Sequence, residues 1–284
     1  MLAHPSGPNP TLTKAVRKLD CRTHKWHPVP SMRVARASAA VGVVGGKIYV
    51  LGGCGDPDSW AEVFDPNTQS WDSLPLPDQT IRCQYIHDSV VVIKDREEKI
   101  YAVNGLDHTF NYSPSESIWG RGTICPHARN RRDWCVVGQL IFSIDGRGNL
   151  CWCEPGQLDS EQGEMCWRDV KGLVSLKESL SSSRLVHFDR KFEAMWESYK
   201  MKMNRGNRRL NDLLPGARLS YSGPNIVLFW DVVEGDRLDI WCAEISLERQ
   251  GQDMWGNIDW CDVVMTADHV LDRFKILHSV SVSL

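Results

Sequence analysis

Cysteine and histidine side chains are the first candidates for metal or nucleophile chemistry in this chain, which holds ten cysteines and nine histidines. Cys151 and Cys153 form the string CWC, and the other cysteines are scattered. Their spacing matches neither two C-x2-C pairs nor a C…H-x3–5-H pattern, the arrangements that hold structural zinc. The sequence also contains neither a nucleophile elbow nor a complete phosphate-binding loop. It therefore predicts no metal site, no cofactor and no catalytic residue.

Arginines in three short strings offer a different chemistry. The strings are PSMRVAR at 30–36, PDQTIR at 77–82 and PHARNRRD at 126–133. Guanidinium groups bind carboxylates and phosphates through paired, charge-assisted hydrogen bonds. We therefore predict a protein-binding site that also includes Asp56 and His108. Its arginines are Arg33, Arg36, Arg82, Arg129, Arg131 and Arg132. The alternative is that each arginine only ties its own loop to a nearby carboxylate.

Tryptophans set a regular spacing along the first part of the chain. Each closes a polar turn, and they stand at Trp26, Trp71, Trp119 and Trp167, separated by 45, 48 and 48 residues. A period of this length is typical of the four-stranded blades of β-propellers. The spacing predicts an all-β fold of repeated sheets, and the length of 284 residues suits a single domain over 17–284.

An apolar strand that ends in glycine precedes the tryptophan in three repeats. The strings are GGKIYVLGG at 45–53, EEKIYAVNG at 97–105 and VGQLIFSIDG at 137–146. We expect Gly52, Gly53 and Gly105 to lie where φ is positive or where the backbone passes close to a neighbour, because a Cβ atom would obstruct both.

A large apolar residue stands seven positions before three of the tryptophans, at Leu19, Phe64 and Tyr112. We predict that the two members of each pair lie on successive strands joined by a polar turn. Side chains of this size at these positions can fill the wedge between adjacent blades.

The order of strands decides which loops meet. In the clearest repeat, 31–77, the four expected strands are 37–44, 47–52, 61–64 and 70–73. Loops between second and third strands then share one face with the loops between blades, and propellers usually bind at such loops. The first set comprises CGDPDS at 54–59, LDHT at 106–109, GRGN at 146–149 and VEGD at 233–236. The second set comprises the three arginine strings, so the predicted binding residues gather on this face.

These strings resemble the kelch repeat, in which apolar residues precede a Gly-Gly and an aromatic residue and a tryptophan follow. The match is strong at 31–77, fair at 81–122 and degenerate at 133–169. The strings LDCRTHKWHPVPSMRVAR, GGKIYVLGG, WAEVFDPNTQSW, DIWCAEISLERQ and WGNIDWCDVV, in this order, are similar to plant F-box/kelch-repeat proteins. The resemblance implies a kelch-type β-propeller. It also implies a partnership in which an F-box docks the Skp adaptor of a cullin-based ubiquitin ligase and the propeller presents the substrate.

Two segments depart from that family pattern. We expect 1–16 to be a disordered lead-in, too short for a three-helix F-box, so that the Skp adaptor is a partner only of a form that carries one. Apolar residues at helical spacing predict an inserted amphipathic helix at 185–204, packed on the propeller or docking a partner. A leading outer strand at 17–27, a last blade at about 220–265 and a C-terminal strand, FKILHSVSVSL, complete the expected fold. The pattern leaves open whether the ring closes.

Charge and hydropathy narrow the environment and the partners. The net charge of −3 and the pI near 6.3 provide no cationic field for a phosphate backbone, so nucleic acid is not an expected partner. The sequence shows no signal peptide and no apolar run of membrane-spanning length. We therefore expect a soluble protein of the cytoplasm, the nucleus or both, whose cysteines are free, buried thiols.

Protein recognition without catalysis is the function that these observations favour, as the substrate-holding part of a cullin-based ubiquitin ligase. A free-standing kelch scaffold or decoy that lacks adaptor binding is the alternative. Because some kelch propellers are copper oxidases, a copper enzyme is a third hypothesis. Its candidate ligands are His24, His27, His87, His108, His127, Tyr112 and Cys54. Copper prefers imidazole-rich sites of defined geometry, and these histidines occur singly or in an outer-strand turn.

Overall fold

The computed structural model describes residues 12–37, 39–56, 58–79, 81–82, 86–94, 97–104, 108–124, 134–145, 148–159, 166–181, 218–234 and 237–268. Contacts divide the chain into two compact units. Unit 1 comprises Met1–Arg129, Glu154–Cys166 and Val282–Leu284, and unit 2 comprises Asn130–Cys153 and Trp167–Ser281. The single domain over 17–284 stays a prediction.

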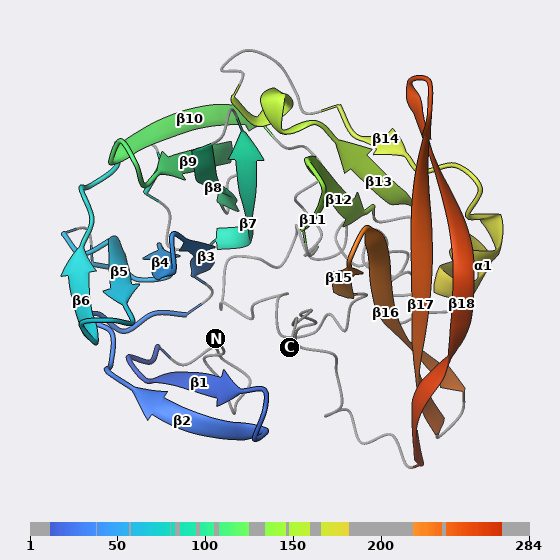
Figure 1. Ribbon diagram of the computed structural model, residues 1–284, viewed down its shortest axis with the longest axis horizontal. Coiled ribbons are helices and arrows are strands. Elements are labelled where there is room, and N and C mark those ends of the chain that lie inside the picture. Colours follow the sequence, from blue (N-terminus) through green and yellow to red (C-terminus); the bar gives the residue numbers. More distant parts are fainter. Residues whose placement is uncertain are drawn as a thin grey trace, which may run out of the picture. The chain divides into compact units, whose positions relative to one another are not determined.

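Unit 1 contains a two-stranded hairpin and two four-stranded antiparallel sheets (Figure 1). The hairpin consists of β1 (Val16–Asp20) and β2 (Lys25–Val29). The first sheet consists of β3 (Ala40–Val44), β4 (Lys47–Leu51), β5 (Ala61–Asp65) and β6 (Ser70–Ser73). The second consists of β7 (Ile86–Lys94), β8 (Glu97–Asn104), β9 (His108–Ser113) and β10 (Ile118–Ile124). A 3₁₀ helix, η1 (Pro155–Asp159), also belongs to this unit.

The sequence assignment of the clearest repeat agrees with the first sheet, in which strands follow one another in chain order. The first strand differs most, because β3 begins at Ala40 instead of residue 37, and β4 and β5 end one residue from the predicted positions, at Leu51 and Asp65. The expected single strand at 17–27 is wrong: that segment turns at residues 21–24 and forms parts of both β1 and β2. Residues 1–11 of the expected disordered lead-in lie outside the described residues. In the part that is described, Thr13 forms an antiparallel β-bridge with Arg36.

The two members of each apolar–tryptophan pair lie on successive strands, as the sequence predicts, and the structure makes them direct cross-strand partners. Leu19 lies opposite Trp26, Phe64 opposite Trp71 and Tyr112 opposite Trp119. In the two sheets the rings also touch, with centroids 5.0 Å apart for Phe64 and Trp71 and 4.5 Å apart for Tyr112 and Trp119. Cross-strand aromatic pairs of this kind stabilise a sheet beyond the area they bury.

Two of these tryptophans also make the same hydrogen bond to a neighbouring element. The indole Nε1 of Trp71 donates to the carbonyl of Pro30, which follows β2, at 2.8 Å. The indole Nε1 of Trp119 donates to the carbonyl of Pro75, which follows β6, at 2.8 Å. Each tryptophan therefore links its own sheet to the segment that follows the preceding hairpin or sheet.

Apolar side chains fill the spaces between the elements of unit 1. One buried cluster joins the hairpin to the first sheet and contains Val16, Met32, Val50, Phe64 and Trp71. A larger cluster joins the first sheet to the second and contains Tyr49, Leu51, Ile100, Phe110 and Tyr112 among its members. The two clusters lie on opposite faces of β4, because successive side chains of a strand alternate in direction. The expected filling between adjacent sheets is thus confirmed for Phe64, Trp71 and Tyr112.

Gly52 and Gly53 directly follow β4 and have positive φ angles of 67° and 71°. A Cβ atom at Gly53 would lie 2.7 Å from the carbonyl oxygen of Ala37, closer than real Cβ atoms approach. The positive φ and the close approach of the backbone both favour glycine at this position, as predicted. Gly105 lies outside the described residues.

Unit 2 contains two further four-stranded antiparallel sheets and one helix. The third sheet consists of β11 (Cys135–Val137), β12 (Leu140–Ile144), β13 (Leu150–Cys153) and β14 (Arg168–Asp169). Helix α1 (Val174–Ser181) follows, and its buried Leu176 and Leu180 stand four residues apart on one face. The fourth sheet consists of β15 (Arg218–Ser222), β16 (Asn225–Glu234), β17 (Arg237–Gln250) and β18 (Asp253–Asp268).

The fourth sheet occupies the stretch where a last blade was expected, although its outer strands are much longer than those of the first sheet (Figure 1). A buried cluster that includes Trp152, Leu176, Trp230 and Ile245 joins both sheets of unit 2 and α1. Trp167, the fourth tryptophan of the period, packs near Trp134 with centroids 6.2 Å apart. The helix expected at 185–204 and the C-terminal strand FKILHSVSVSL lie outside the described residues.

Eight cysteines lie in the described part of the chain, and all are free thiols. Five of them are buried, whereas Cys166 and Cys261 are exposed, contrary to expectation. Burial raises the pKa of the Cys242 thiol to about 11, so this thiol stays protonated at neutral pH. Over the same residues, none of the helices has the length and apolar character needed to span a membrane.

Candidate functional site

Two loops meet at one end of the first sheet, as the predicted strand order requires. The loop 52–60 joins β4 to β5, and the segment 30–39 joins β2 to β3. The backbone N–H of Ala37 donates to the carbonyl of Gly53 at 2.8 Å, which ties the two segments together. Ile86, at the start of β7, lies against Gly52. We call the exposed surface of 30–39, 52–60 and 77–82 the loop cluster.

Arg36 holds the loop cluster together from the inside. Its side chain is 2% exposed, and its Nε donates to the Glu62 carboxylate at 2.9 Å. Its terminal nitrogens donate to three backbone carbonyls of the loop 52–60, those of Gly52, Ser59 and Trp60, at 2.6 to 2.8 Å. The prediction that Arg36 binds a partner is therefore wrong, because burial and internal hydrogen bonds occupy its guanidinium group. The alternative, an arginine that ties a loop to a carboxylate, is correct at this residue.

Glu62 is the residue of this region that sequence reasoning missed. It lies on β5 with 1% exposure, and it accepts hydrogen bonds from Arg36 and from the backbone N–H of Arg33 at 2.8 Å. A charged residue is almost never buried unless it is paired. The only signal in the sequence is that Glu62 stands inside a short apolar strand, AEVF, two positions before Phe64.

Three other predicted binding residues lie in these loops, and a fourth, His108, lies in the second sheet. Arg33 and Asp56 are exposed, and Asp56 accepts a hydrogen bond from the backbone of Asp58 at 2.9 Å. Arg82 is half-buried, and its Nε donates to the carbonyl of Pro77 at 2.8 Å. His108 is exposed at the start of β9. Their binding role stays a prediction, and Arg129, Arg131 and Arg132 lie outside the described residues.

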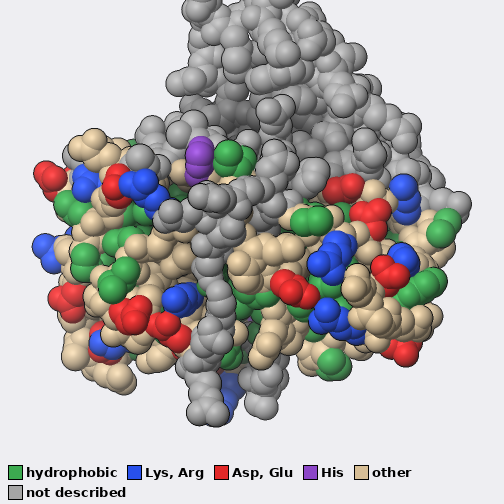
Figure 2. All heavy atoms as spheres, turned by 90° about the horizontal axis from the view of Figure 1, so that it is seen from above, with side chains coloured by type: hydrophobic (Ala, Val, Ile, Leu, Met, Phe, Trp, Pro, Cys, Tyr) green, Lys and Arg blue, Asp and Glu red, His purple; other side chains and the backbone are tan. Residues whose placement is uncertain are grey.

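The described side chains of one face are mixed in charge. Figure 2 shows acidic, basic and apolar side chains interspersed over this face. Over these residues no single sign of charge dominates the view. Recognition at such a surface has to come from local groups.

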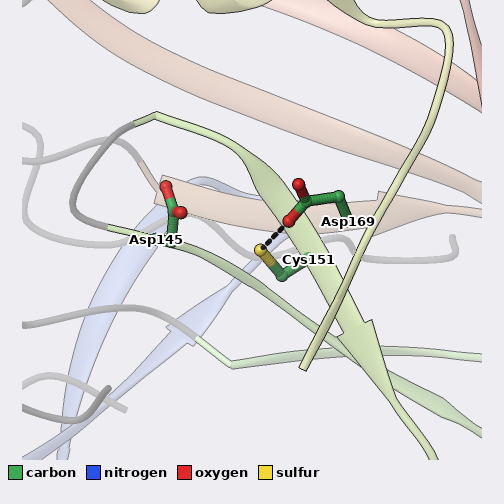
Figure 3. A group of neighbouring side chains, drawn as sticks. All are labelled: Asp145, Cys151 and Asp169. Carbon is green, nitrogen blue, oxygen red and sulfur yellow. Dashed lines mark hydrogen bonds between the residues drawn. The ribbon is translucent and has the colours of Figure 1, made fainter. Parts of the chain in front are cut away.

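Asp145, Cys151 and Asp169 form the group most similar to a metal site among the described residues. Their ligand atoms lie within 4.8 Å of one another. Figure 3 shows the three side chains and the hydrogen bond between Cys151 and Asp169. The Cys151 thiol donates to the Asp169 carboxylate at 3.4 Å, and the Asp145 carboxylate accepts two hydrogen bonds from Asn149 at 2.8 Å. These hydrogen bonds explain why the three side chains are close. Structural zinc uses four ligands, mostly sulfur and nitrogen, so the group supports no metal assignment.

The candidate copper ligands do not converge in the described residues. His24 lies in the β1–β2 turn, His27 on β2 and His108 on β9, and all three are exposed. Tyr112 is buried in the apolar cluster between the two sheets, and the Cys54 thiol accepts a hydrogen bond from Arg36 at 3.2 Å. The His87 side chain and His127 lie outside the described part.

Antiparallel four-stranded sheets that repeat along the chain, glycines that end β4 and tryptophans paired across the outer strands define a kelch-repeat protein. The model of the FKB95 kelch-repeats domain matches residues 5–206. A putative F-box/kelch-repeat protein of Arabidopsis thaliana is 40% identical over 284 residues, covering 94% of this chain and 71% of that protein. A second one from the same plant is 33% identical over 271 residues, covering 91% and 56%. An Arabidopsis F-box/kelch-repeat protein is 31% identical over 293 residues, covering 96% and 61%.

The chain therefore belongs to the plant F-box/kelch-repeat family. It spans less than two thirds of the length of two of these three relatives.

Proposed function

We propose that this chain is a protein-recognition module that holds a substrate for a cullin-based ubiquitin ligase and has no catalytic activity of its own. The observation that carries the proposal is membership of the F-box/kelch-repeat family, which extends over most of the chain. We propose binding of the Skp adaptor for any form of the protein that carries an F-box.

The loop cluster is the surface that we propose for target binding. Loops on a rigid scaffold are the usual place for binding residues. Arg36 and Glu62 fix the loops 30–39 and 52–60 in one arrangement, so little ordering is required when a partner binds. Exposed Arg33 offers a guanidinium group for an acidic or phosphorylated segment, and half-buried Arg82 adds a positive charge in the segment 77–82.

Affinity capture with a charge-reversed variant tests this proposal. The recombinant chain and the variant Arg33→Glu/Arg82→Glu are immobilised, and proteins retained from extract of proteasome-inhibited plant cells are quantified by mass spectrometry. We expect a set of proteins that the unmodified chain retains and the variant loses. Their direct binding is then measured with each purified candidate.

The matched control is Arg22→Glu/Lys25→Glu, which reverses two exposed charges at the β1–β2 turn. It should retain the same proteins as the unmodified chain. Circular dichroism spectra of all three proteins should superimpose. Equal retention by the Arg33→Glu/Arg82→Glu variant would refute the loop cluster as the target-binding surface.

A further inference from the structure

The hairpin β17–β18 carries an ordered set of side chains on the face that points away from the unit 2 core. Ala243, Ile245 and Leu247 of β17 pack in or against the core cluster. Side chains alternate along a strand, so Glu244, Ser246 and Glu248 project from the opposite face. Their cross-strand partners are Trp260, Asn257 and Trp255, in that order. Two glutamate–tryptophan pairs therefore lie on one face, separated by the Ser246–Asn257 pair.

Both tryptophans of this face are accessible to solvent. Trp255 is 40% exposed and Trp260 is 42% exposed. Glu248, Asp259 and Asp262 are exposed beside them, and Glu244 is half-buried. Tryptophan is enriched at the energetic centres of protein interfaces, so two accessible indole rings on one face are suited to contact a partner.

Neutral hydrogen-bond donors hold the carboxylates in place. Glu244 accepts from the indole of Trp260 at 2.9 Å and from the Asn225 amide at 3.0 Å. Asp259 accepts from Ser246 at 2.9 Å and from Asn257 at 3.1 Å. These bonds orient the oxygen atoms while leaving each negative charge uncompensated.

Three cations among the described residues of unit 2 are engaged by other groups. The guanidinium of Arg249 lies over the ring of Trp152 at 5.6 Å, on the core side of the sheet. Lys171 pairs with Asp253 at 2.6 Å, at the end of this face next to the β17–β18 turn, and Arg237 pairs with Asp239 at 2.9 Å at the other end of the hairpin. Within the described residues, Glu244, Glu248, Asp259 and Asp262 thus have no cationic partner. The face is acidic, aromatic and ready to receive positive charge.

We propose that this face of β17–β18 binds an extended segment of a partner protein that carries two lysines or arginines four residues apart. Glu244 and Glu248 are four residues apart on one strand, which corresponds to about 13 Å at ~3.3 Å per residue. An extended peptide repeats at the same spacing, so its two cations reach both pairs at once. Each cation lies against a carboxylate and over the face of an indole ring, and both contacts are attractive.

Fluorescence anisotropy with a labelled peptide tests the proposal. The probe is a heptapeptide with lysines at its second and sixth positions and threonine or valine between them. The variant Glu244→Gln/Glu248→Gln removes two charges while glutamine still accepts the indole hydrogen bond of Trp260. We expect its affinity to fall about tenfold, because each pair contributes an ion pair and a cation–π contact.

Two controls keep the test specific. Asp72→Asn/Glu116→Gln removes the same charge from exposed positions of unit 1 and should bind the probe as the unmodified chain does. A peptide whose lysines are three positions apart should bind more weakly than the probe. Absence of binding by the unmodified chain, or equal loss with the unit 1 variant, would overturn the proposal.

The same measurements separate a second copy of this chain from a basic peptide as the occupant. A dimer that forms with rising protein concentration and disappears in Glu244→Gln/Glu248→Gln would assign the face to self-association and refute the peptide site. The proposal uses residues of unit 2 only, so it stands or falls independently of the loop cluster.

Discussion

The first and the fourth sheet place a glutamate on their third strand and a tryptophan on their fourth, and the two sheets use these residues in opposite ways. In the first sheet, Glu62 is buried against Arg36 and the indole of Trp71 donates to the backbone of Pro30. In the fourth sheet, Glu244 has no cationic partner in the described part of the chain, and the indole of Trp260 donates to Glu244 itself. The same residue types are internal in one sheet and form a surface in the other.

What differs is the neighbour that covers each outer strand. Strands β5 and β6 are five and four residues long, and Val16 of the β1–β2 hairpin and Met32, just after it, pack against them. Strands β17 and β18 are 14 and 16 residues long, and Trp255 and Trp260 of β18 remain exposed. Burial lowers the local dielectric, so an unpaired charge is costly in the first sheet and tolerable in the fourth.

The largest expected effect comes from Arg36→Met. The substitution leaves Glu62 buried without its cation and removes three hydrogen bonds to loop carbonyls. Removal of one partner of a buried ion pair costs about 3–5 kcal/mol, so the free energy of unfolding should fall by about that amount. Urea denaturation followed by tryptophan fluorescence measures it. Because the tryptophans lie in both units, a change in the shape of the transition would also show whether the units unfold together.

The controls for this loss are Arg33→Met in unit 1 and Glu244→Gln in unit 2. Arg33 is exposed and uses only its backbone N–H to contact Glu62, so its side chain should contribute within about 0.5 kcal/mol. Glu244→Gln removes a glutamate charge that needs no cationic partner and should also be nearly neutral. If Arg36→Met were as mild as either control, the contrast between buried and surface charge would be lost.

A smaller effect is expected from Gly53→Ala, compared with Gly251→Ala in the β17–β18 turn. Both glycines have positive φ, at 71° and 65°, so both substitutions carry the same backbone strain of about 1 kcal/mol. Only Gly53 also meets a neighbouring backbone, at the carbonyl of Ala37, whereas nothing lies within 4 Å of a Cβ atom at Gly251. The crowding should add about 1–3 kcal/mol to the loss at Gly53. Equal midpoints of denaturation for the two variants would show that the close approach has no energetic weight.

The repeat made much of the first unit predictable. Cross-strand pairing of Phe64 with Trp71 and of Tyr112 with Trp119 followed from the spacing alone, because seven residues are what a strand end, a four-residue turn and a strand start require. The glycines after β4 were predictable for the same reason: only glycine tolerates both the positive φ and the contact with Ala37. Local geometry with a period is visible in a sequence.

The sequence offered the structural role of Arg36 only as an alternative for every arginine, because the string PSMRVAR has the same composition as an exposed binding loop. Its burial depends on Glu62, 26 residues later, and on carbonyls that converge only when the loop 52–60 has folded. The acidic face of β17–β18 was hidden for a related reason. Its glutamate–tryptophan pairs join residues that are 7 and 16 positions apart, and an extra residue of β18, Asp259, breaks the simple alternation along that strand.

The smallest expected effect compares Trp71→Phe with Trp260→Phe. Phenylalanine at residue 71 keeps the ring against Phe64 but loses the indole donor, which leaves the Pro30 carbonyl without this bond and opens a small void in a nearly closed core. We expect a loss of about 1–2 kcal/mol in the free energy of unfolding. At residue 260 the indole is 42% exposed and water can replace its hydrogen bond to Glu244, so the loss should stay within about 0.5 kcal/mol.

The peptide probe should respond in the reverse order, because phenylalanine is a weaker cation–π partner than tryptophan and only Trp260 lies on the acidic face. If Trp71→Phe lowered both the free energy of unfolding and the peptide affinity more than Trp260→Phe did, Trp71 would not be a purely structural residue and Trp260 would not be a binding residue.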